Sequence, residues 1–348
     1  MKVGVIYGGL SVEREVSIKT GKNMINALKS KDYDVKEILI NDETDYLKLI
    51  NEHCDIFLIG LHGGAGENGS LQALLDFHHI TYVGSNMASS CISMDKWKTK
   101  QILKNIGIPV AEDLYVLNKE EININEIVSK LTFPIVAKPN NEGSSIGLTI
   151  IKNQDVLEGI LKNNEFHDGS LLLEEYISGK EVTVGVIGEL GMERALPVVE
   201  IVPDSEFYDY KSKYVKGKSK HIIPAALDTS LLSTIQDYAV KTHRILECKT
   251  YSRVDFIIDT YNIPKVLEIN TLPGMTDTSL FPDAIKSEGV NYPDMIELLL
   301  YYEMKNFIKI NEHKKNLSNN SLKKIKKFKQ VILDLDINEA LIKNKEQN

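Results

Sequence analysis

The chain has 348 residues, of which 43% are hydrophobic and 26% charged, and its formal net charge is −8. An acidic chain argues against nucleic acid as the main partner, because duplex binding depends on neutralising many phosphates. The longest apolar runs, at 56–61 and 171–177, are shorter than the roughly 20 residues of a membrane-spanning helix, so we expect a cytoplasmic protein without an integral membrane segment.

The N-terminal part of the chain predicts a parallel sheet. Strand-like runs at 2–7 and 56–61 are each followed by a glycine-rich turn and a helical pattern, at about 12–29 and 70–78. This repeated order favours parallel strands, and in such sheets ligands bind at the carboxyl ends of the strands. Residues 81–85 suggest one more strand.

The pattern changes after a helix that we expect at 93–106, with Ser93 as its N-cap. The later segments indicate a mixed α+β region with antiparallel pairing. Strands are expected at 133–139, 142–151, 170–177, 181–187, 195–201, 253–259 and 265–270, and helices at 228–247 and 293–308.

Two acids and an amide on the last strand pair form a candidate metal site. Strand alternation places Glu268 and Asn270 on one face, and Asp255 lies on the neighbouring strand. Carboxylates in apolar strands are costly to bury without compensation, and magnesium prefers carboxylate and phosphate oxygens. We therefore expect these three residues to hold two Mg²⁺ or Mn²⁺ ions against nucleotide phosphates. The alternative is a hydrogen-bonded carboxylate pair between the strands.

Two lysines and a glycine-rich loop are candidates for binding the phosphates themselves. Lys138 ends an apolar strand, and Lys96 lies on the helix expected at 93–106, so each offers a point charge. The loop at 142–147 (EGSSIG) suits the approach of backbone N–H groups to an anion. It is not a Walker A loop, because no Gly-Lys-Ser/Thr follows it. Solvated lysines and a plain hairpin turn are the alternatives.

Several longer motifs occur together in one order and spacing. They are GGLSVEREVS at 8–17, LHGGAGENGSLQ at 61–72, KPNNEGSSIG at 138–147, EEYISGKEVTVGV at 174–186, FYDYKSKY at 207–214, RVDF at 253–256 and EINTLPGMT at 268–276. In these motifs the chain resembles the D-alanine:D-alanine ligases of the ATP-grasp superfamily, over about residues 2–304.

The resemblance implies an α/β fold in three parts, which a C-terminal extension follows. A Rossmann-like N-terminal substrate-binding domain (1–92) precedes a central and a C-terminal α+β ATP-grasp subdomain (93–185 and 186–304). Residues 205–220 resemble a mobile lid over the site. The extension at 305–348 lies beyond the resemblance and has 11 Lys against 5 Asp and Glu, a balance of +6. We expect it to pack on the acidic body as a helix, with attachment to anionic lipid as the alternative.

The implied reaction is the ATP-dependent joining of two D-alanines into D-alanyl-D-alanine for peptidoglycan synthesis, by a homodimer. Because amide formation is uphill in water, ATP first converts one carboxylate into an acyl phosphate, which the second amine attacks, releasing ADP and phosphate. A D-alanyl-D-lactate or D-alanyl-D-serine ligase is the nearest alternative, and Tyr214 argues against it. A catalytically silent ATP-binding regulatory module is the alternative from another class.

The resemblance also assigns residues to the ATP site, which lies between two sheets, and agrees with the metal ligands inferred above. The hinge that binds adenine corresponds to 174–177, and Glu175 stands where some relatives carry Lys. The ATP-site positions are Lys96, Lys138, Ser144, Ser145, Glu174, Glu175, Tyr176, Ile177, Glu181, which contacts the ribose, and Lys213.

For the first D-alanine, the resemblance implies that Glu13 binds the ammonium group in a network with Ser144 and Tyr214. By hypothesis, Arg253 and the backbone amide of Gly274 stabilise the tetrahedral intermediate, on which negative charge develops.

Ser279 and Leu280 match the positions that receive the second D-alanine's carboxylate. Asp277 and Thr278 precede them, where many relatives have Ser and His, and a carboxylate beside an anionic substrate is unexpected. His62 follows a strand end and is a candidate for positioning the reacting carboxyl group, with a structural role as the alternative.

Overall fold

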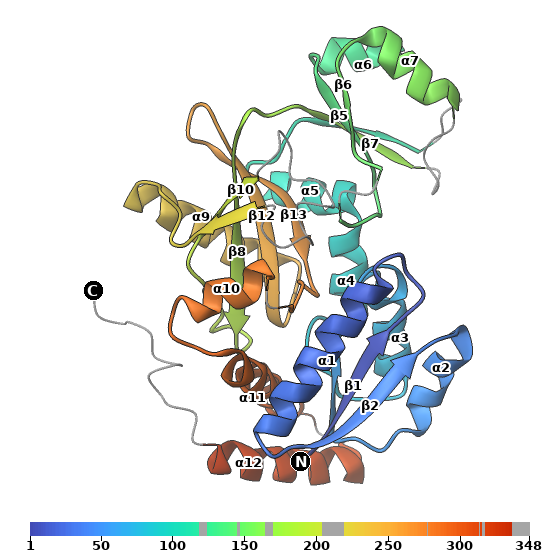
Figure 1. Cartoon of the computed structure of the whole chain (residues 1–348), viewed down its shortest axis with the longest axis vertical. Coiled ribbons are helices and arrows are strands. Elements are labelled where there is room, and N and C mark those ends of the chain that lie inside the picture. Colours follow the sequence, from blue (N-terminus) through green and yellow to red (C-terminus); the bar gives the residue numbers. More distant parts are fainter. Residues whose placement is uncertain are drawn as a thin grey trace.

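The computed structural model describes residues 1–117, 124–144, 147–163, 170–203, 219–276, 278–312, 314 and 317–335. Three sheets lie one above another along the long axis of the molecule (Figure 1). The blue N-terminal domain is at the bottom, the sheet that contains β8 and β12 is in the middle, and the sheet that contains β5 and β7 is at the top.

The N-terminal sheet is parallel, as predicted, with strand order β2-β1-β3. Residues 81–85 do not form a strand, because only Tyr82 makes a bridge, to Phe57. The elements are β1 (Lys2–Gly8), α1 (Arg14–Ser30), β2 (Asp34–Ile40), α2 (Glu43–Lys48), β3 (Ile56–Ile59), α3 (Ser70–Phe77) and α4 (Met87–Met94).

The helix expected at 93–106 is in fact two helices, α4 and α5 (Lys96–Asn105). Ser93 lies in the last turn of α4, and the N-cap of α5 is Asp95, whose carboxylate accepts from the backbone N–H of Lys98 at 2.9 Å. The extended backbone of Asp95 (ψ 95°) separates the two helices. Asn140 joins this turn to the top sheet, because its side chain donates to Asp95 at 2.8 Å.

The top sheet is antiparallel, in the order β4-β7-β5-β6, and α6 and α7 pack on it. The strand expected at 142–151 is confined to its end, because Ser144 and Gly147 have left-handed backbones (φ 54° and 72°). The elements are β4 (Asp113–Val116), α6 (Ile124–Lys130), β5 (Ile135–Pro139), β6 (Thr149–Ile151), α7 (Gln154–Asn163) and β7 (Leu171–Glu175).

The middle sheet is also antiparallel, in the order β11-β10-β8-β12-β13, with β9 beside β8. Its strands are β8 (Gly179–Gly188), β9 (Arg194–Ala195), β10 (Val199–Pro203), β11 (Ser219–Ile222), β12 (Thr250–Asp259) and β13 (Pro264–Asn270). Strand β8 crosses the predicted boundary at 185–186, and the division of the chain into the four ranges stays a prediction. The lid predicted at 205–220 lies outside the described residues except where β11 begins.

Helices cover the middle sheet and join it to the N-terminal domain. Helix α9 (Thr229–Ile245) packs on the face that buries Val254 and Phe256, while Phe281 of α10 (Leu280–Lys286) packs against Tyr251 on the other face. Helix α11 (Tyr292–Asn311) contacts both β12 and α1. None of the helices in the described parts of the chain is long and apolar enough to cross a membrane.

The basic extension continues as α12 (Asn319–Asp334), which packs along α11 below the N-terminal sheet (Figure 1). Phe328 is fully buried, and Lys327 contacts both carboxylate oxygens of Asp55 at 2.6 Å. This part of the extension therefore packs on the acidic body as a helix, as expected, and 336–348 lie outside the described residues.

Candidate active site

A pocket lies where the N-terminal domain, the turn between α4 and α5, the loop after β5 and the end of β13 meet. Two of the three predicted metal ligands and one predicted phosphate-binding lysine line it. The lining residues are Glu67, Ser93, Met94, Lys96, Gly143, Glu268, Ile269, Asn270 and Thr271.

The register of the middle sheet gathers the predicted metal ligands on one face. Asp255 lies directly opposite Glu268 on β13, and opposite Thr183 on β8. Residues opposite one another in an antiparallel pair share a face, and Asn270 follows two residues after Glu268. The hydroxyl of Thr183 donates to Asp255 Oδ1 at 2.5 Å and fixes that carboxylate.

Two cations accompany the two carboxylates. Arg253 holds Asp255 in a bidentate pair, with Nε at 2.8 Å from Oδ1 and Nη2 at 2.7 Å from Oδ2. The Nζ of Lys96 lies 3.4 Å from Glu268 Oε2 and donates to the backbone carbonyl of Glu142 at 2.5 Å. Lys96 thus ties β13 to the glycine-rich loop.

The donor set fits a hard cation such as Mg²⁺ or Mn²⁺. Asp255, Glu268 and Asn270 offer only oxygen atoms, which both ions prefer. In the described ranges no three His, Cys, Asp or Glu side chains form a cluster able to hold a metal. Because magnesium is octahedral, two carboxylates and an amide leave coordination positions for phosphate and water oxygens, as is usual for magnesium bound with a nucleotide.

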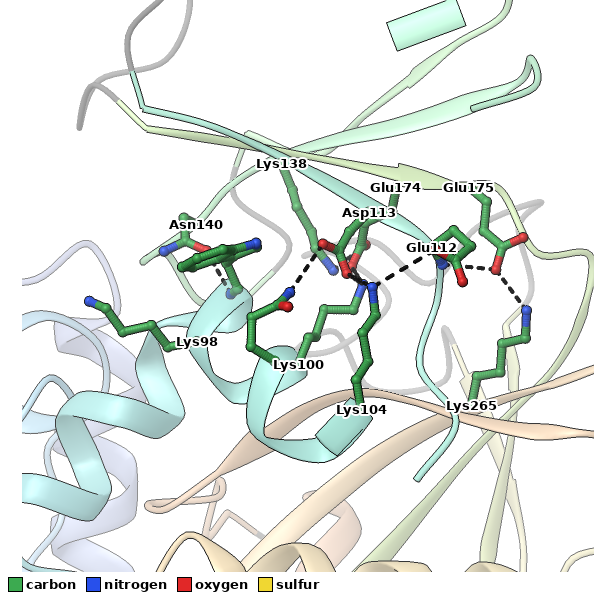
Figure 2. A network of polar contacts seen from close by, with 12 residues as sticks. Lys98, Lys100, Lys104, Glu112, Asp113, Lys138, Asn140, Glu174, Glu175 and Lys265 are labelled. Carbon is green, nitrogen blue, oxygen red and sulfur yellow. Dashed lines mark hydrogen bonds and ion pairs between the residues drawn. The ribbon is translucent and has the colours of Figure 1, made fainter. Parts of the chain in front are cut away.

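A buried ion network lies between α5 and the top sheet (Figure 2). The Nζ of Lys138 is 2.5 Å from Glu174 Oε2, and Lys100 donates to Glu174 Oε1. Burial by itself would raise the pKa of Glu174, but the two lysines overcome this and lower it to about 2. Lys138, a predicted phosphate ligand, therefore has a carboxylate partner in the hinge.

The hinge itself continues from β7 toward β8. Glu175 pairs with Lys265 of β13 at 2.7 Å and accepts from the backbone N–H of Glu112 at 3.0 Å (Figure 2). Tyr176 is exposed and Ile177 is half-buried, while Glu181 lies on β8 opposite Ile257.

The N-terminal domain contributes the predicted amino-acid site. Glu13, just before α1, is buried, and its Oε1 accepts from the Ser144 hydroxyl at 2.5 Å. This bond joins the N-terminal domain to the loop after β5, as the predicted network requires. The backbone of Gly63 lies so close to Glu13 that a Cβ at this position would be 2.7 Å from Oε2, so the position requires glycine.

His62 is buried with partners on both ring nitrogens. Nε2 lies 2.8 Å from the Thr20 hydroxyl, and Nδ1 lies 3.5 Å from Glu67 Oε1. Because Glu67 also lines the pocket, His62 orients a carboxylate at the edge of the site.

The predicted second-substrate residues form a turn at the start of α10. The Ser279 hydroxyl accepts from the backbone N–H of Thr276 at 3.0 Å and lies 2.8 Å from that residue's hydroxyl. Gly274 has no room for a side chain, because a Cβ would lie 2.8 Å from Ser279 Oγ. The side chain of Leu280 is apolar and buried, so only its backbone N–H could donate to a carboxylate.

Some predicted residues lie outside the described ranges, and some site residues were missed by the sequence analysis. The residues outside the described ranges are Ser145, Lys213, Tyr214 and Asp277. The residues that the sequence analysis missed are Glu67, Lys100, Asn140 and Thr183. Glu67, Asn140 and Thr183 occur within motifs that carry the resemblance, so a signal for them was available, whereas Lys100 lies outside these motifs and depends on contacts between distant segments.

Two family models match the chain. The D-ala D-ala ligase N-terminus model matches residues 2–53, and the D-ala D-ala ligase C-terminus model matches residues 102–301. The C-terminal match alone spans more than half of the chain.

Relatives of known sequence agree with these models. A D-alanine–D-alanine ligase from Halalkalibacterium halodurans is 45% identical over 307 residues, which cover 88% of this chain and 100% of the relative. A ligase of the same name from Carboxydothermus hydrogenoformans is 43% identical over 305 residues, covering 86% and 97%.

Solved structures agree as well. The D-alanine–D-alanine ligase from Bacillus anthracis in complex with ATP has a TM-score of 0.76 and 34% identity, covering 88% of this chain and 97% of that one. The VanG D-Ala:D-Ser ligase from Enterococcus faecalis has a TM-score of 0.75 and 28% identity, covering 87% and 99%. The chain therefore belongs to the D-alanine–D-alanine ligase family.

Proposed function

We propose that the chain uses ATP to join two D-alanines into D-alanyl-D-alanine, releasing ADP and phosphate, as a step in peptidoglycan synthesis. The observation that carries this proposal is the pocket in which Glu67 of the N-terminal domain faces Lys96, Glu268 and Asn270. We assign the side of this pocket that Glu67 lines to the amino acid and the side with Lys96, Glu268 and Asn270 to the phosphates. The names of the sequence relatives favour D-alanine as both substrates.

The reaction needs an activated carboxylate. A carboxylate oxygen of the first D-alanine attacks the γ-phosphorus of ATP, and ADP leaves. Lys96 and Lys138 supply positive charge to the phosphates, and we assign Lys213 the same role. Glu13, fixed by Ser144, binds the ammonium group of this D-alanine and thereby orients the attack.

The second step forms the amide bond. The neutral amine of the second D-alanine attacks the acyl carbon, and the oxygen of the acyl group becomes negative. Phosphate leaves when the carbonyl is restored, and the nitrogen releases one proton to solvent. Arg253 and the Gly274 amide stabilise the negative oxygen. Ser279 and the Leu280 amide bind the carboxylate of the second substrate, and Tyr214 completes the network of Glu13.

Asp255, Glu268 and Asn270 would hold Mg²⁺ or Mn²⁺, two ions per site, which shield the phosphate charge when bound. Thr183 and Arg253 fix Asp255 so that the carboxylate keeps its direction. The hinge residues Glu174 to Ile177 and Glu181 are the proposed contacts for adenosine. A homodimer and a cytoplasmic location stay predictions.

One assay tests the class and the specificity together. The full chain is incubated with ATP, Mg²⁺ and equal concentrations of D-alanine, D-serine and D-lactate, and products are identified by mass. We expect D-alanyl-D-alanine to dominate, with one phosphate released per dipeptide. A dominant D-alanyl-D-serine or D-alanyl-D-lactate product would replace the proposal with that ligase, whereas ATP binding without D-alanine-dependent phosphate release would indicate a silent module.

A further inference from the structure

We propose that Lys100, a residue with no assigned role in the reaction, is a positioning residue that neutralises Glu174 and thereby leaves Lys138 available to the phosphates of ATP. This inference rests on the proposed function, in which Lys138 binds a phosphate. In this proposal Lys100 does not touch ATP and acts through Glu174 on Lys138, which does.

The geometry places Lys100 where solvent cannot replace it. Lys100 comes from α5 and is 1% exposed, and it meets Glu174 of β7, whose side chain is 4% exposed (Figure 2). On the other carboxylate oxygen of Glu174 lies Lys138 of β5. The two lysines therefore share one buried carboxylate from opposite sides.

The network continues beyond Lys100 with charges of alternating sign. Lys100 Nζ lies 3.7 Å from Asp113 Oδ2, and Lys104, at the partly exposed end, lies 2.9 Å from the same oxygen (Figure 2). Lys104 also lies 3.9 Å from Glu112 Oε2, so three lysines and three acids give this network no net charge.

The division of roles follows from the cost of an unpaired buried charge. A buried carboxylate that loses its cation is strongly destabilised. When Lys138 turns to a phosphate, Glu174 keeps Lys100 as its partner, so the move leaves no bare carboxylate. Without Lys100, Glu174 would hold Lys138 and compete with the nucleotide for it.

A double-mutant cycle tests this coupling by ATP affinity, measured by calorimetry on the full chain without D-alanine. We expect Lys100→Met to weaken ATP binding about tenfold. In the Glu174→Gln background, where residue 174 carries no charge that needs a partner, the same Lys100→Met change should alter ATP affinity less than about threefold. The effect of any direct contact between Glu174 and ATP on the measured affinity cancels, because Lys100→Met is always compared with the parent of its own background.

The steady-state kinetics add a readout that a loss of stability would not produce. Lys100→Met should raise the KM for ATP while kcat at saturating ATP stays within about threefold. Arg244→Met is the matched control, because Arg244 pairs at 2.6 Å with Glu193, whose side chain is 3% exposed and lies outside the site. That variant should lower the melting temperature without changing ATP affinity.

Equal losses of ATP affinity in both backgrounds, or an unchanged affinity in Lys100→Met, would overturn the proposal. If Lys100→Met alone does not fold, the Glu174→Gln pair can still refute the argument, because a change above threefold there contradicts it. Product analysis keeps the two proposals apart. A parent chain that binds ATP but makes no dipeptide refutes the ligase assignment and leaves the Lys100 measurement valid.

Discussion

Helix α12 buries Phe328 completely, and this residue gives a quantitative test of how the C-terminal extension packs. Its ring meets Phe307 of α11 edge to face, with centroids 5.4 Å apart and planes at 78°. Burial of a phenylalanine contributes about 1.5–3 kcal/mol, and such an aromatic pair adds about 0.5–1.5 kcal/mol. With the cavity that remains, Phe328→Ala should lower the free energy of unfolding by about 3–5 kcal/mol.

The measurement is urea denaturation followed by circular dichroism, with Leu333→Ala as control. Leu333 lies on the same helix and is 78% exposed, so its truncation should change stability by less than about 0.5 kcal/mol. A loss below about 1 kcal/mol in Phe328→Ala would refute the packing of α12 on the body. Because α12 contributes no residue to the pocket, kcat of the folded Phe328→Ala protein should equal that of the parent.

Three further predictions concern polar groups with defined partners. Burial raises the pKa of Glu303 to about 7, so the folded protein keeps a proton that the unfolded chain releases, and stability should fall by about 3 kcal/mol between pH 4.5 and 7. Glu303→Gln should lack this fall in urea titrations at both pH values, and an equal fall in both proteins would contradict the assignment. Arg253→Ala should reduce kcat about 10²–10³-fold while calorimetric ATP affinity changes less than tenfold, and an unchanged kcat would reject its role. Ser144→Ala removes the 2.5 Å bond to Glu13, so the KM for D-alanine should rise about tenfold with the KM for ATP unchanged, and a rise in the KM for ATP alone would assign Ser144 to the nucleotide.

The metal face was predictable because its pattern is local. Glu268 and Asn270 are two residues apart on one strand, so alternation places them on one face. Asp255 was predicted only to lie on the neighbouring strand, and the register of β12 against β13 sets it opposite Glu268. The partner Thr183 was not predictable in this way. It lies 72 positions before Asp255, and only the register of β8 against β12 brings the two together.

The errors have local physical causes. The prediction of a strand over 142–151 was wrong in its first part, because the left-handed backbone at Ser144 turns the chain toward Glu13. The single helix expected at 93–106 treated Asp95 as a helical residue. Its carboxylate instead caps α5 and receives Asn140 from the top sheet, a contact that no periodicity contains.

Glu175 illustrates how a departure from the family pattern acquires a structural reason. By the resemblance, some relatives carry lysine at this position. Here the side chain turns away from Glu174 and pairs with Lys265 of β13, so it joins the top and middle sheets between which ATP is proposed to bind (Figure 2). A lysine at 175 would face the ammonium of Lys265, and like charges at this separation repel. The acid at 175 therefore complements the lysine at 265, while the hinge residues remain the contacts proposed for adenosine.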